Sequence, residues 1–152
     1  MYKILKLTYL ILTTIILSTP ASAQDKQDPD QRINLLLSAD ERHLVLSEMR
    51  GFVITIDGIL DGIAMEDFEK VAKISRTMGS AAANTIPPQT VAKLPENFKQ
   101  LASQVHGGFD MIALDAESMG DTNHTISQLS RITKNCIACH ATYKIQTIQR
   151  RQ

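Results

Sequence analysis

The chain has 152 residues, of which 43% are hydrophobic and 21% are charged, and its 16 basic and 16 acidic side chains give a net charge of zero. This composition excludes a disordered chain and a collagen-like repeat. A single long apolar stretch, at the N-terminus, excludes a membrane protein with several spans. The chain has no excess of basic residues, so its charge does not indicate nucleic-acid binding. The length of the chain predicts one domain. With 5% aromatic residues and no Trp, we expect its core to be aliphatic.

The first 23 residues have the pattern of a secretory signal peptide. Lys3 and Lys6 form a basic start, an apolar run from Leu7 to Leu17 follows, and Ala21-Ser22-Ala23 is a small-residue cleavage motif. Because the apolar run is short for a membrane span, we expect cleavage after Ala23, a periplasmic location and no stable membrane span in the mature chain. Cleavage removes both lysines and leaves 14 basic against 16 acidic residues, a net charge of −2.

Residues 24–37 are expected to form a polar N-terminal extension with a short apolar lead-in, and residues 38–152 a helical domain. The first helix is predicted to begin at Ser38, which forms with Glu41 the S-x-x-E pattern of a capping box. Gly58 and Gly62 are expected to fray its end. Its apolar residues alternate at spacings of four and three, as in the seam of a helix bundle: Val45, Met49, Phe52, Ile56, Ile59 and Ile63.

A second helix is predicted over about residues 66–78, with a stop at Gly79. Residues 84–94 contain Pro87-Pro88 and are predicted to be a connection. Strict alternation with period two and hairpin dipeptides such as Asn-Gly are missing, which argues against a sheet.

A third helix is predicted to open at Pro95 and to run to about Met119. Gly107-Gly108 in its middle marks either a local weak point or the close approach of a neighbouring helix or a ligand. The fourth helix is predicted to begin after an Asp121 N-cap, with an apolar seam that fades at Thr147. Four runs with short connections predict an all-α protein, an antiparallel up-down-up-down four-helix bundle.

The motif that carries chemistry is Cys136-Ile137-Ala138-Cys139-His140, a C-x-x-C-H sequence that contains both cysteines of the chain. This spacing is typical of c-type haem attachment. The two thiols form thioethers with the two vinyl groups of one haem, and the imidazole that follows becomes an axial ligand of the iron. On a helix, residues 136 and 140 share a face and residue 139 lies beside them, so the three side chains can converge on one planar cofactor.

Three other interpretations of the motif agree less well with the sequence. A thiol–disulfide redox pair is expected after a strand at the start of a helix, whereas a helical run precedes this motif. A zinc site needs about four ligands, and His43, His106 and His124 lack ligand spacing to the cysteines. A structural disulfide between helix positions i and i+3 is a poor staple and leaves His140 without a role.

With a single C-x-x-C-H motif near the C-terminus, on the last of four helices, the sequence resembles class II cytochromes c, which comprise cytochrome c′ and its low-spin relatives. The resemblance covers about residues 38–147. It implies a four-helix bundle with one covalent haem c on the last helix, attached through Cys136 and Cys139 and ligated through its iron by His140. Tyr143 matches an aromatic residue that often follows the motif in this family.

The resemblance leaves the distal side of the haem undecided. Arg42 matches an arginine that is common early in the first helix and is a candidate partner of a haem propionate. Low-spin members carry a ligating Met four residues after that arginine, whereas cytochrome c′ often has an apolar residue there. The position is Leu46 in this chain, which favours an open distal pocket, but Met49 lies one turn further and its soft sulfur suits haem iron. His106, on the third helix, is another candidate distal ligand.

Two functions correspond to the two distal arrangements. With Met49 as the sixth ligand, we expect a periplasmic one-electron carrier that exchanges electrons with redox protein partners. With Leu46 over an open iron, we expect binding of small gases such as nitric oxide or carbon monoxide. A haem-free helical interaction module is a third hypothesis, which requires the motif to be accidental. The sequence contains no pattern of catalytic residues, so we do not expect an enzyme. A homodimer is a candidate state, because cytochrome c′ often dimerises.

Overall fold

The computed structural model describes residues 29–148. The predicted signal peptide, residues 1–23, lies outside the described residues, and so does its cleavage site. Residues 32–148 belong to one folded unit.

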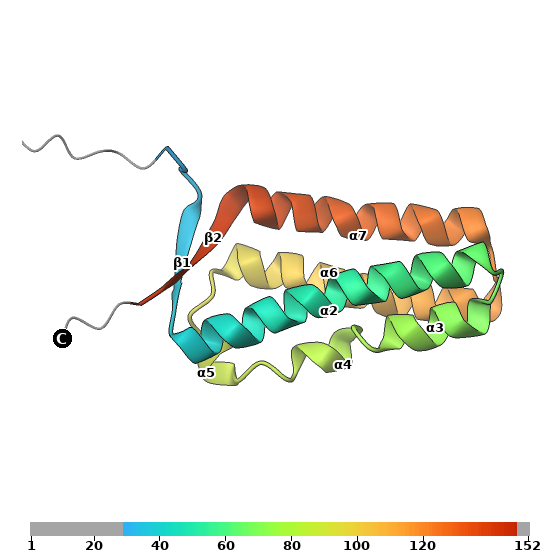
Figure 1. Ribbon diagram of the computed structural model, residues 1–152, viewed down its shortest axis with the longest axis horizontal. Helices are drawn as coiled ribbons and strands as arrows, with labels where there is room; N and C mark the ends of the chain where they lie inside the picture. The colour runs from blue at the N-terminus through green and yellow to red at the C-terminus, as the bar shows by residue number, and fades with distance from the viewer. Residues whose placement is uncertain (1–28, 149–152) are drawn as a thin grey trace, which may run out of the picture. The chain divides into compact units, whose positions relative to one another are not determined.

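This unit is mainly helical, which confirms the all-α class (Figure 1). The first three predicted helices are present close to their expected positions. The fourth predicted helix is also present, but it ends earlier than expected. Two short helices, α4 and α5, occupy the region between the second and third predicted helices. The elements are β1 (Ile33–Leu37), α2 (Ala39–Ala64), α3 (Phe68–Arg76), α4 (Ser80–Ala83), α5 (Pro88–Val91), α6 (Glu96–Ser118), α7 (Thr122–Thr142) and β2 (Tyr143–Thr147).

The predicted capping box at the start of α2 is present. Ser38 Oγ accepts a hydrogen bond from the backbone N–H of Glu41 at 3.3 Å, and the backbone N–H of Ser38 donates to Glu41 Oε2 at 2.8 Å. Lys93 Nζ also lies 2.6 Å from Glu41 Oε1. Lys93 and the Ser38 N–H together lower the pKa of Glu41 to about 2. The cap therefore also ties the segment before α6 to the start of α2.

The prediction that Gly58 and Gly62 fray the end of α2 was wrong, because the helix continues through both to Ala64. Their role is to admit α3. A Cβ atom on Gly58 would lie 2.7 Å from Ile74 Cδ1, and one on Gly62 would lie 2.8 Å from Val71 Cγ2. The two glycines thus let α3 approach α2 more closely than any side chain would allow.

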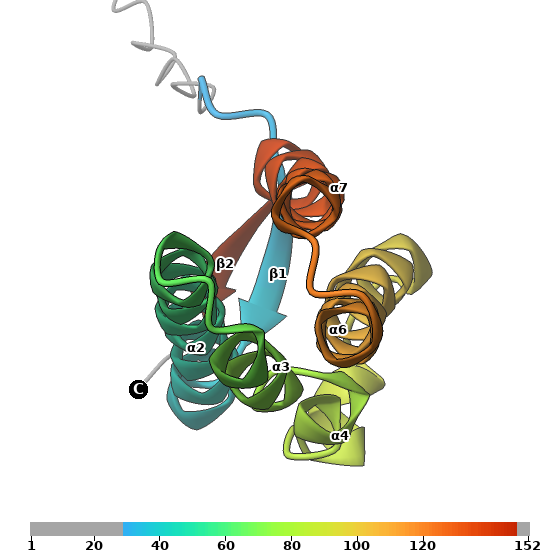
Figure 2. The ribbon, with the colours of Figure 1, turned by 90° about the vertical axis from the view of Figure 1, so that its right-hand side faces the viewer.

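Four helices lie side by side along the unit, and Figure 2 views them end on. The packed neighbours are α2 with α3, α3 with α6, and α6 with α7. In Figure 1, α2 and α6 run in one direction while α3 and α7 run in the other. An open groove separates α2 from α7. No helix among residues 29–148 is both long and apolar enough to cross a membrane.

The main core lies where α2, α3, α6 and α7 meet. Phe109 of α6 is completely buried and its ring stacks on that of Phe52 of α2, with centroids 5.8 Å apart. The seam predicted for the first helix is confirmed, since Val45, Phe52 and Ile59 are buried. The core cluster consists of Phe52, Ile59, Val71, Ala72, Val105, Phe109, Ile112, Ala116, Leu129 and Ile132.

The two strands were not predicted. The helix α7 ends at Thr142, and Tyr143 takes an extended conformation, with φ −121° and ψ 148°, that begins β2. The segment 33–37, expected as a packed lead-in, is β1 and pairs in parallel with β2, with Ile33 opposite Tyr143. Leu37 and Tyr143 are buried in a second cluster, where the Tyr143 ring meets Phe98 edge to face at 5.5 Å. Tertiary packing at the end of the helices therefore overrides the helical periodicity of this segment.

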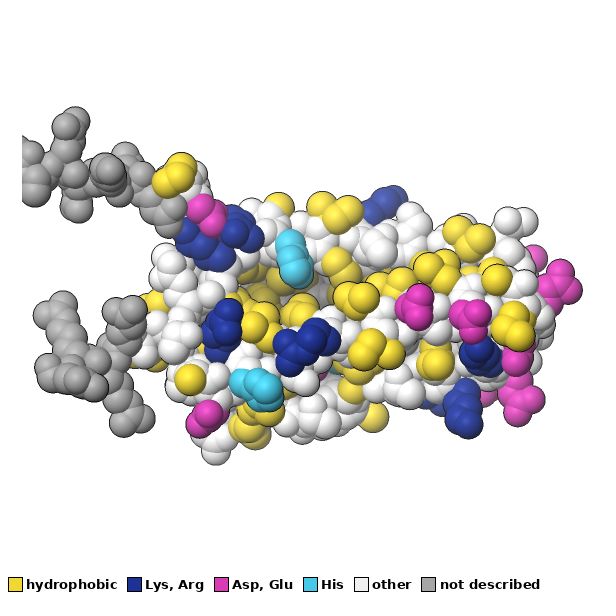
Figure 3. All heavy atoms as spheres, viewed as in Figure 1, with side chains coloured by type: hydrophobic (Ala, Val, Ile, Leu, Met, Phe, Trp, Pro, Cys, Tyr) yellow, Lys and Arg dark blue, Asp and Glu magenta, His cyan; other side chains and the backbone are white. Residues whose placement is uncertain are grey.

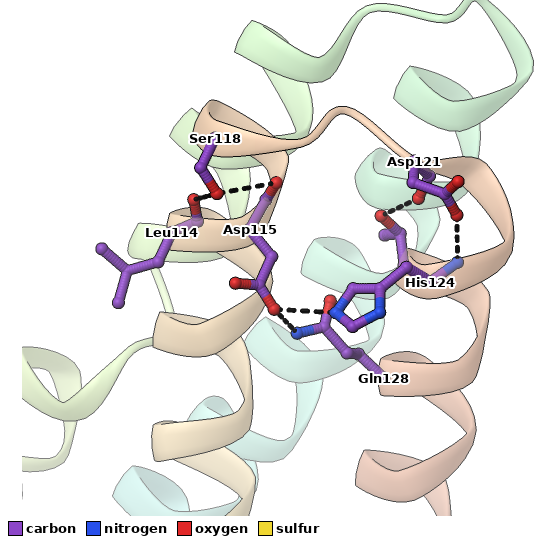
Figure 4. Close-up of polar contacts among 7 residues, drawn as sticks. Leu114, Asp115, Ser118, Asp121, His124 and Gln128 are labelled. Carbon is purple, nitrogen blue, oxygen red and sulfur yellow. Dashed lines mark hydrogen bonds and ion pairs between the residues drawn. The ribbon is translucent and has the colours of Figure 1, made fainter.

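The connection between α6 and α7 is organised by two aspartates (Figure 4). Asp121 is the predicted N-cap of α7, and its Oδ1 accepts a hydrogen bond from the backbone N–H of His124 at 2.6 Å. Asp115 Oδ2 lies 2.8 Å from His124 Nε2 and accepts a hydrogen bond from Gln128 Nε2 at 2.6 Å. Gly120 has φ +58°, a left-handed conformation that favours glycine and lets the chain turn between the helices. These contacts fix the angle between the two helices at this end.

The paired glycines in α6 provide a matched test of the packing. The helix is continuous through both, and a Cβ on Gly108 would lie 2.7 Å from Ile132 Cγ1 of α7, whereas one on Gly107 would meet nothing within 4 Å. We expect Gly107→Ala to raise the free energy of unfolding by about 0.5–1 kcal/mol through helix propensity. We expect Gly108→Ala to lower it by about 1–3 kcal/mol, because buried Ile132 must move. Urea denaturation measures both changes, and equal effects of the two substitutions would contradict this packing.

Candidate functional site

Four residues of the predicted site, Leu46, Met49, Cys136 and His140, line a groove between α2 and α7. The groove has a volume of about 870 Å³ and its walls are mostly apolar. Figure 3 shows hydrophobic side chains gathered along the face where these two helices come together. Its lining residues are Leu46, Met49, Arg50, Phe52, Val53, Ile54 and Ile56 of α2, and Thr133, Cys136, Ile137 and His140 of α7.

One stripe of α2 forms the first wall of the groove. Residues 46, 49, 53 and 56 recur at spacings of three and four, which places them on one side of a helix. Leu46 and Met49, the two candidate distal residues, are both half-buried and both line the groove. The structure thus brings both candidates to the same place.

The last turns of α7 form the opposite wall. Cys136 and His140 are four residues apart, so both face the groove, as the motif predicts. Cys139 lies one turn from Cys136 and packs against the second cluster, which contains Leu37 and Tyr143. Met49 packs against the main core, as Cys136 does, and also against the second cluster, as Cys139 does.

Both cysteines are free thiols and half-buried. Burial raises the pKa of the Cys136 thiol above its ordinary value. Burial also raises the pKa of Cys139, and the neighbouring charge of Cys136 adds to this effect. The two groups are therefore protonated near neutral pH, unlike the low-pKa thiolate of a thiol–disulfide catalyst.

Arg50 is a lining residue that the sequence analysis missed, whereas Arg42 lies outside the groove. Arg42 borders a polar recess of about 640 Å³ together with Ile145, Gln146 and Thr147 of β2. Arg50 stands on the groove wall, one residue after Met49. The spacing of four between positions 46 and 50 was the available signal, because residues four apart share a helix face.

His106 does not line the groove. Its side chain is buried in α6, with Nδ1 2.8 Å from the carbonyl oxygen of Met78 and 3.2 Å from that of Gly79. Its Nε2 lies 3.3 Å from Glu48 Oε1. Burial opposes the charged ring, but Glu48 and the two carbonyls outweigh it and raise the pKa of His106. Both ring nitrogens face groups outside the groove, so this geometry gives no support to His106 as a distal ligand.

The zinc interpretation also lacks a ligand set. Among the residues that the structure describes, no group of three or more His, Cys, Asp or Glu side chains is arranged to hold a metal ion. The two thiols and the imidazole of the motif do not form such a group among these residues either, and a zinc site needs about four ligands.

Comparison with protein-family models, with curated proteins and with solved structures gave no match to this chain.

The residues of the groove fit a haem. Haem iron is commonly held by an imidazole on one side and by a thioether on the other, and a C-x-x-C pair supplies the thiols for covalent attachment. His140 and Cys136 stand on one wall, and Met49 stands on the other. A groove of about 870 Å³ is within the usual size range of cofactor sites, and its apolar walls suit a porphyrin face.

The buried state of the thiols can be tested on the chain without haem. With both cysteines reduced, we expect iodoacetamide to label the folded chain at pH 7 more slowly than the urea-unfolded chain. The reason is that burial limits access and raises the pKa of both thiols, and the thiolate is the reactive form. Intact mass against time gives the rates, and Cys136→Ser and Cys139→Ser report each thiol separately. Equal rates in the folded and unfolded chains would contradict the burial.

Proposed function

We propose that this protein is a c-type cytochrome that carries one electron at a time. The observation that carries the proposal is the placement of the C-x-x-C-H motif. Cys136 and His140 on α7 face Met49 on α2 across an apolar groove. The export pattern of residues 1–23 adds to the proposal, because c-type haem is attached outside the bacterial cytoplasm.

Each residue of the proposed site has one role. Cys136 and Cys139 would hold the haem through thioether bonds, and His140 and Met49 would bind its iron. The bound haem supplies reversible one-electron oxidation and reduction of its iron. His140 and Met49 belong to the long helices α7 and α2, which would hold the two iron-binding side chains in place.

The apolar walls of the groove have a second function in this proposal. Phe52 and Ile56 exclude water from the site, and a low dielectric together with a thioether ligand raises the reduction potential. Val53, Ile54 and Ile137 at the groove are 66%, 69% and 68% exposed, which is costly for large apolar side chains gathered in one place. A porphyrin lying between α2 and α7 would cover part of this apolar surface.

The fold supports the same proposal. The alternating directions of α2, α3, α6 and α7 agree with an up-down-up-down four-helix bundle in which the last helix carries the haem. This is the arrangement implied by the resemblance to class II cytochromes c. Arg42 remains a predicted partner of a haem propionate, and Arg50 on the groove wall is a second candidate.

A second function is supported by Leu46. This residue lines the same groove as Met49, so it can cover the distal side of the haem if the sulfur of Met49 does not ligate the iron. The iron would then be five-coordinate and open to small uncharged gases such as nitric oxide or carbon monoxide. Both functions need the same covalent haem and differ in the distal residue.

Covalent attachment is tested by mass. After expression with c-type maturation in the periplasm, we expect the mass of the chain from residue 24 onward plus one porphyrin, and a red colour that survives acid–acetone extraction. The double variant Cys136→Ser/Cys139→Ser should have the mass of the bare polypeptide, because no thioether can form. A wild-type protein with the bare mass would contradict the proposed function.

The distal ligand is tested by Met49→Leu. We expect the oxidised protein to lose its Met–iron charge-transfer band and its reduction potential to fall, because the thioether that favours ferrous iron is gone. Met111→Leu is the matched control, since Met111 lies on α6, outside the groove lining, and is 50% exposed. An unchanged band in Met49→Leu would exclude Met49 as the ligand. Rapid carbon monoxide binding to the wild-type protein would then favour the open site behind Leu46.

A further inference from the structure

A buried contact network joins α6 to α2 on the side away from the groove. Its centre is His106, whose side chain is 3% exposed. Its Nδ1 faces the carbonyl oxygens of Met78 and Gly79, which lie between α3 and α4. Its Nε2 faces Glu48 of α2. One side chain of α6 therefore contacts two other segments of the chain.

The identity of the neighbouring groups decides where the protons of this network lie. Carbonyl oxygens only accept hydrogen bonds, so Nδ1 of His106 must carry a hydrogen. Glu48 Oε1 is closed off from solvent and has no well-aligned hydrogen-bond donor, and the facing Nε2 lies 3.3 Å away. A proton held between Nε2 and the carboxylate removes the repulsion between a nitrogen lone pair and the facing carboxylate oxygen. Glu48 and His106 thus depend on each other for their burial.

The same histidine also touches α2 one turn later. The Phe52 ring meets the His106 ring edge to face, with centroids 5.0 Å apart, and stacks on Phe109. Met78 adds a third contact, because its sulfur occupies the space beside Gly51, 2.9 Å from where a Cβ would stand. Positions 48, 51 and 52 of α2 are therefore all held from the same side.

These contacts flank Met49. In a helix each residue is rotated by about 100° from the one before it, so fixing positions 48 and 52 also fixes the direction of position 49. Glu48 lines a cavity of about 680 Å³ on the far side of α2, together with His106, while Met49 lines the groove. A rotation of α2 that released Glu48 would turn Met49 away from α7.

We propose that His106 is a positioning residue, which holds α2 at the rotation that directs Met49 into the groove. The proposal rests on the proposed function, since it assigns to His106 the placement of Met49 over the haem. It predicts that His106 controls the distal side of the haem without touching the haem.

The test compares His106→Gln with His124→Gln in the haem-loaded protein. Both histidines contact a carboxylate, but His124 lies near the α6–α7 connection and has no contact with α2 in its network. The readout is the NMR signal of the Met49 methyl group, assigned with Met49→Leu. It is recorded in the reduced protein, under carbon monoxide if the iron is open, because the porphyrin ring current shifts this signal strongly.

We expect His106→Gln to move the Met49 methyl signal toward its position in an unfolded chain and, if Met49 ligates the iron, to reduce the Met–iron band at least twofold. His124→Gln should leave both unchanged. Glu48→Gln is the conservative variant and should largely preserve the wild-type signal, because its amide oxygen can still accept a hydrogen bond from Nε2. A His106→Gln protein that loses stability but keeps the Met49 signal would overturn the proposal.

If His106→Gln does not fold, Glu48→Ala removes the same contact between His106 and α2 without leaving a buried unpaired carboxylate. We expect the Met49 signal to shift in this variant too, and an unmoved signal would overturn the proposal. Absence of the porphyrin mass in wild-type protein would instead refute the proposed function. The two failures are therefore distinguishable.

Discussion

The feature on which the rest of this structure depends is the unequal packing of its four main helices, α2, α3, α6 and α7. Gly58 and Gly62 bring α2 against α3, and Gly108 brings α6 against α7, because an added Cβ at each would lie within 2.9 Å of a neighbouring side chain. No such close contact joins α2 to α7, and the groove lies between them. The helices α3 and α6 also pack directly on each other, so three sides of the helical core are closed and the fourth, between α2 and α7, stays open and apolar.

The strand pair closes the end of this arrangement. Because β1 leads into α2 and β2 continues from α7, their parallel pairing joins the two helices that border the groove. Arg32 Nη1 adds a hydrogen bond to the carbonyl oxygen of His140 at 3.2 Å, which ties the start of β1 to the last turn of α7. The groove is therefore held open between two helices whose ends are linked. This arrangement suits a cofactor that is bound between two helices.

The two sides of α2 face different surroundings. One side presents Leu46 and Met49 to the groove, and the other packs Glu48 against His106. Phe52 lies between the two, because it lines the groove and its ring also meets His106. The first side decides what chemistry a bound haem could perform. The second determines how the first is oriented, since a helix side chain cannot turn independently of its backbone.

The sequence by itself determined the helical class, the capping box at Ser38, the N-cap at Asp121 and the face shared by Cys136 and His140. These features depend on spacings within about one helical turn, so local geometry is sufficient to predict them. Only the tertiary structure decided that Gly58 and Gly62 admit α3, that residues 33–37 and 143–147 pair as strands, and that Arg50 rather than Arg42 lines the groove. It also placed His106 against Glu48. Each of these features depends on contacts between residues far apart in the chain, whose partners no local pattern can specify.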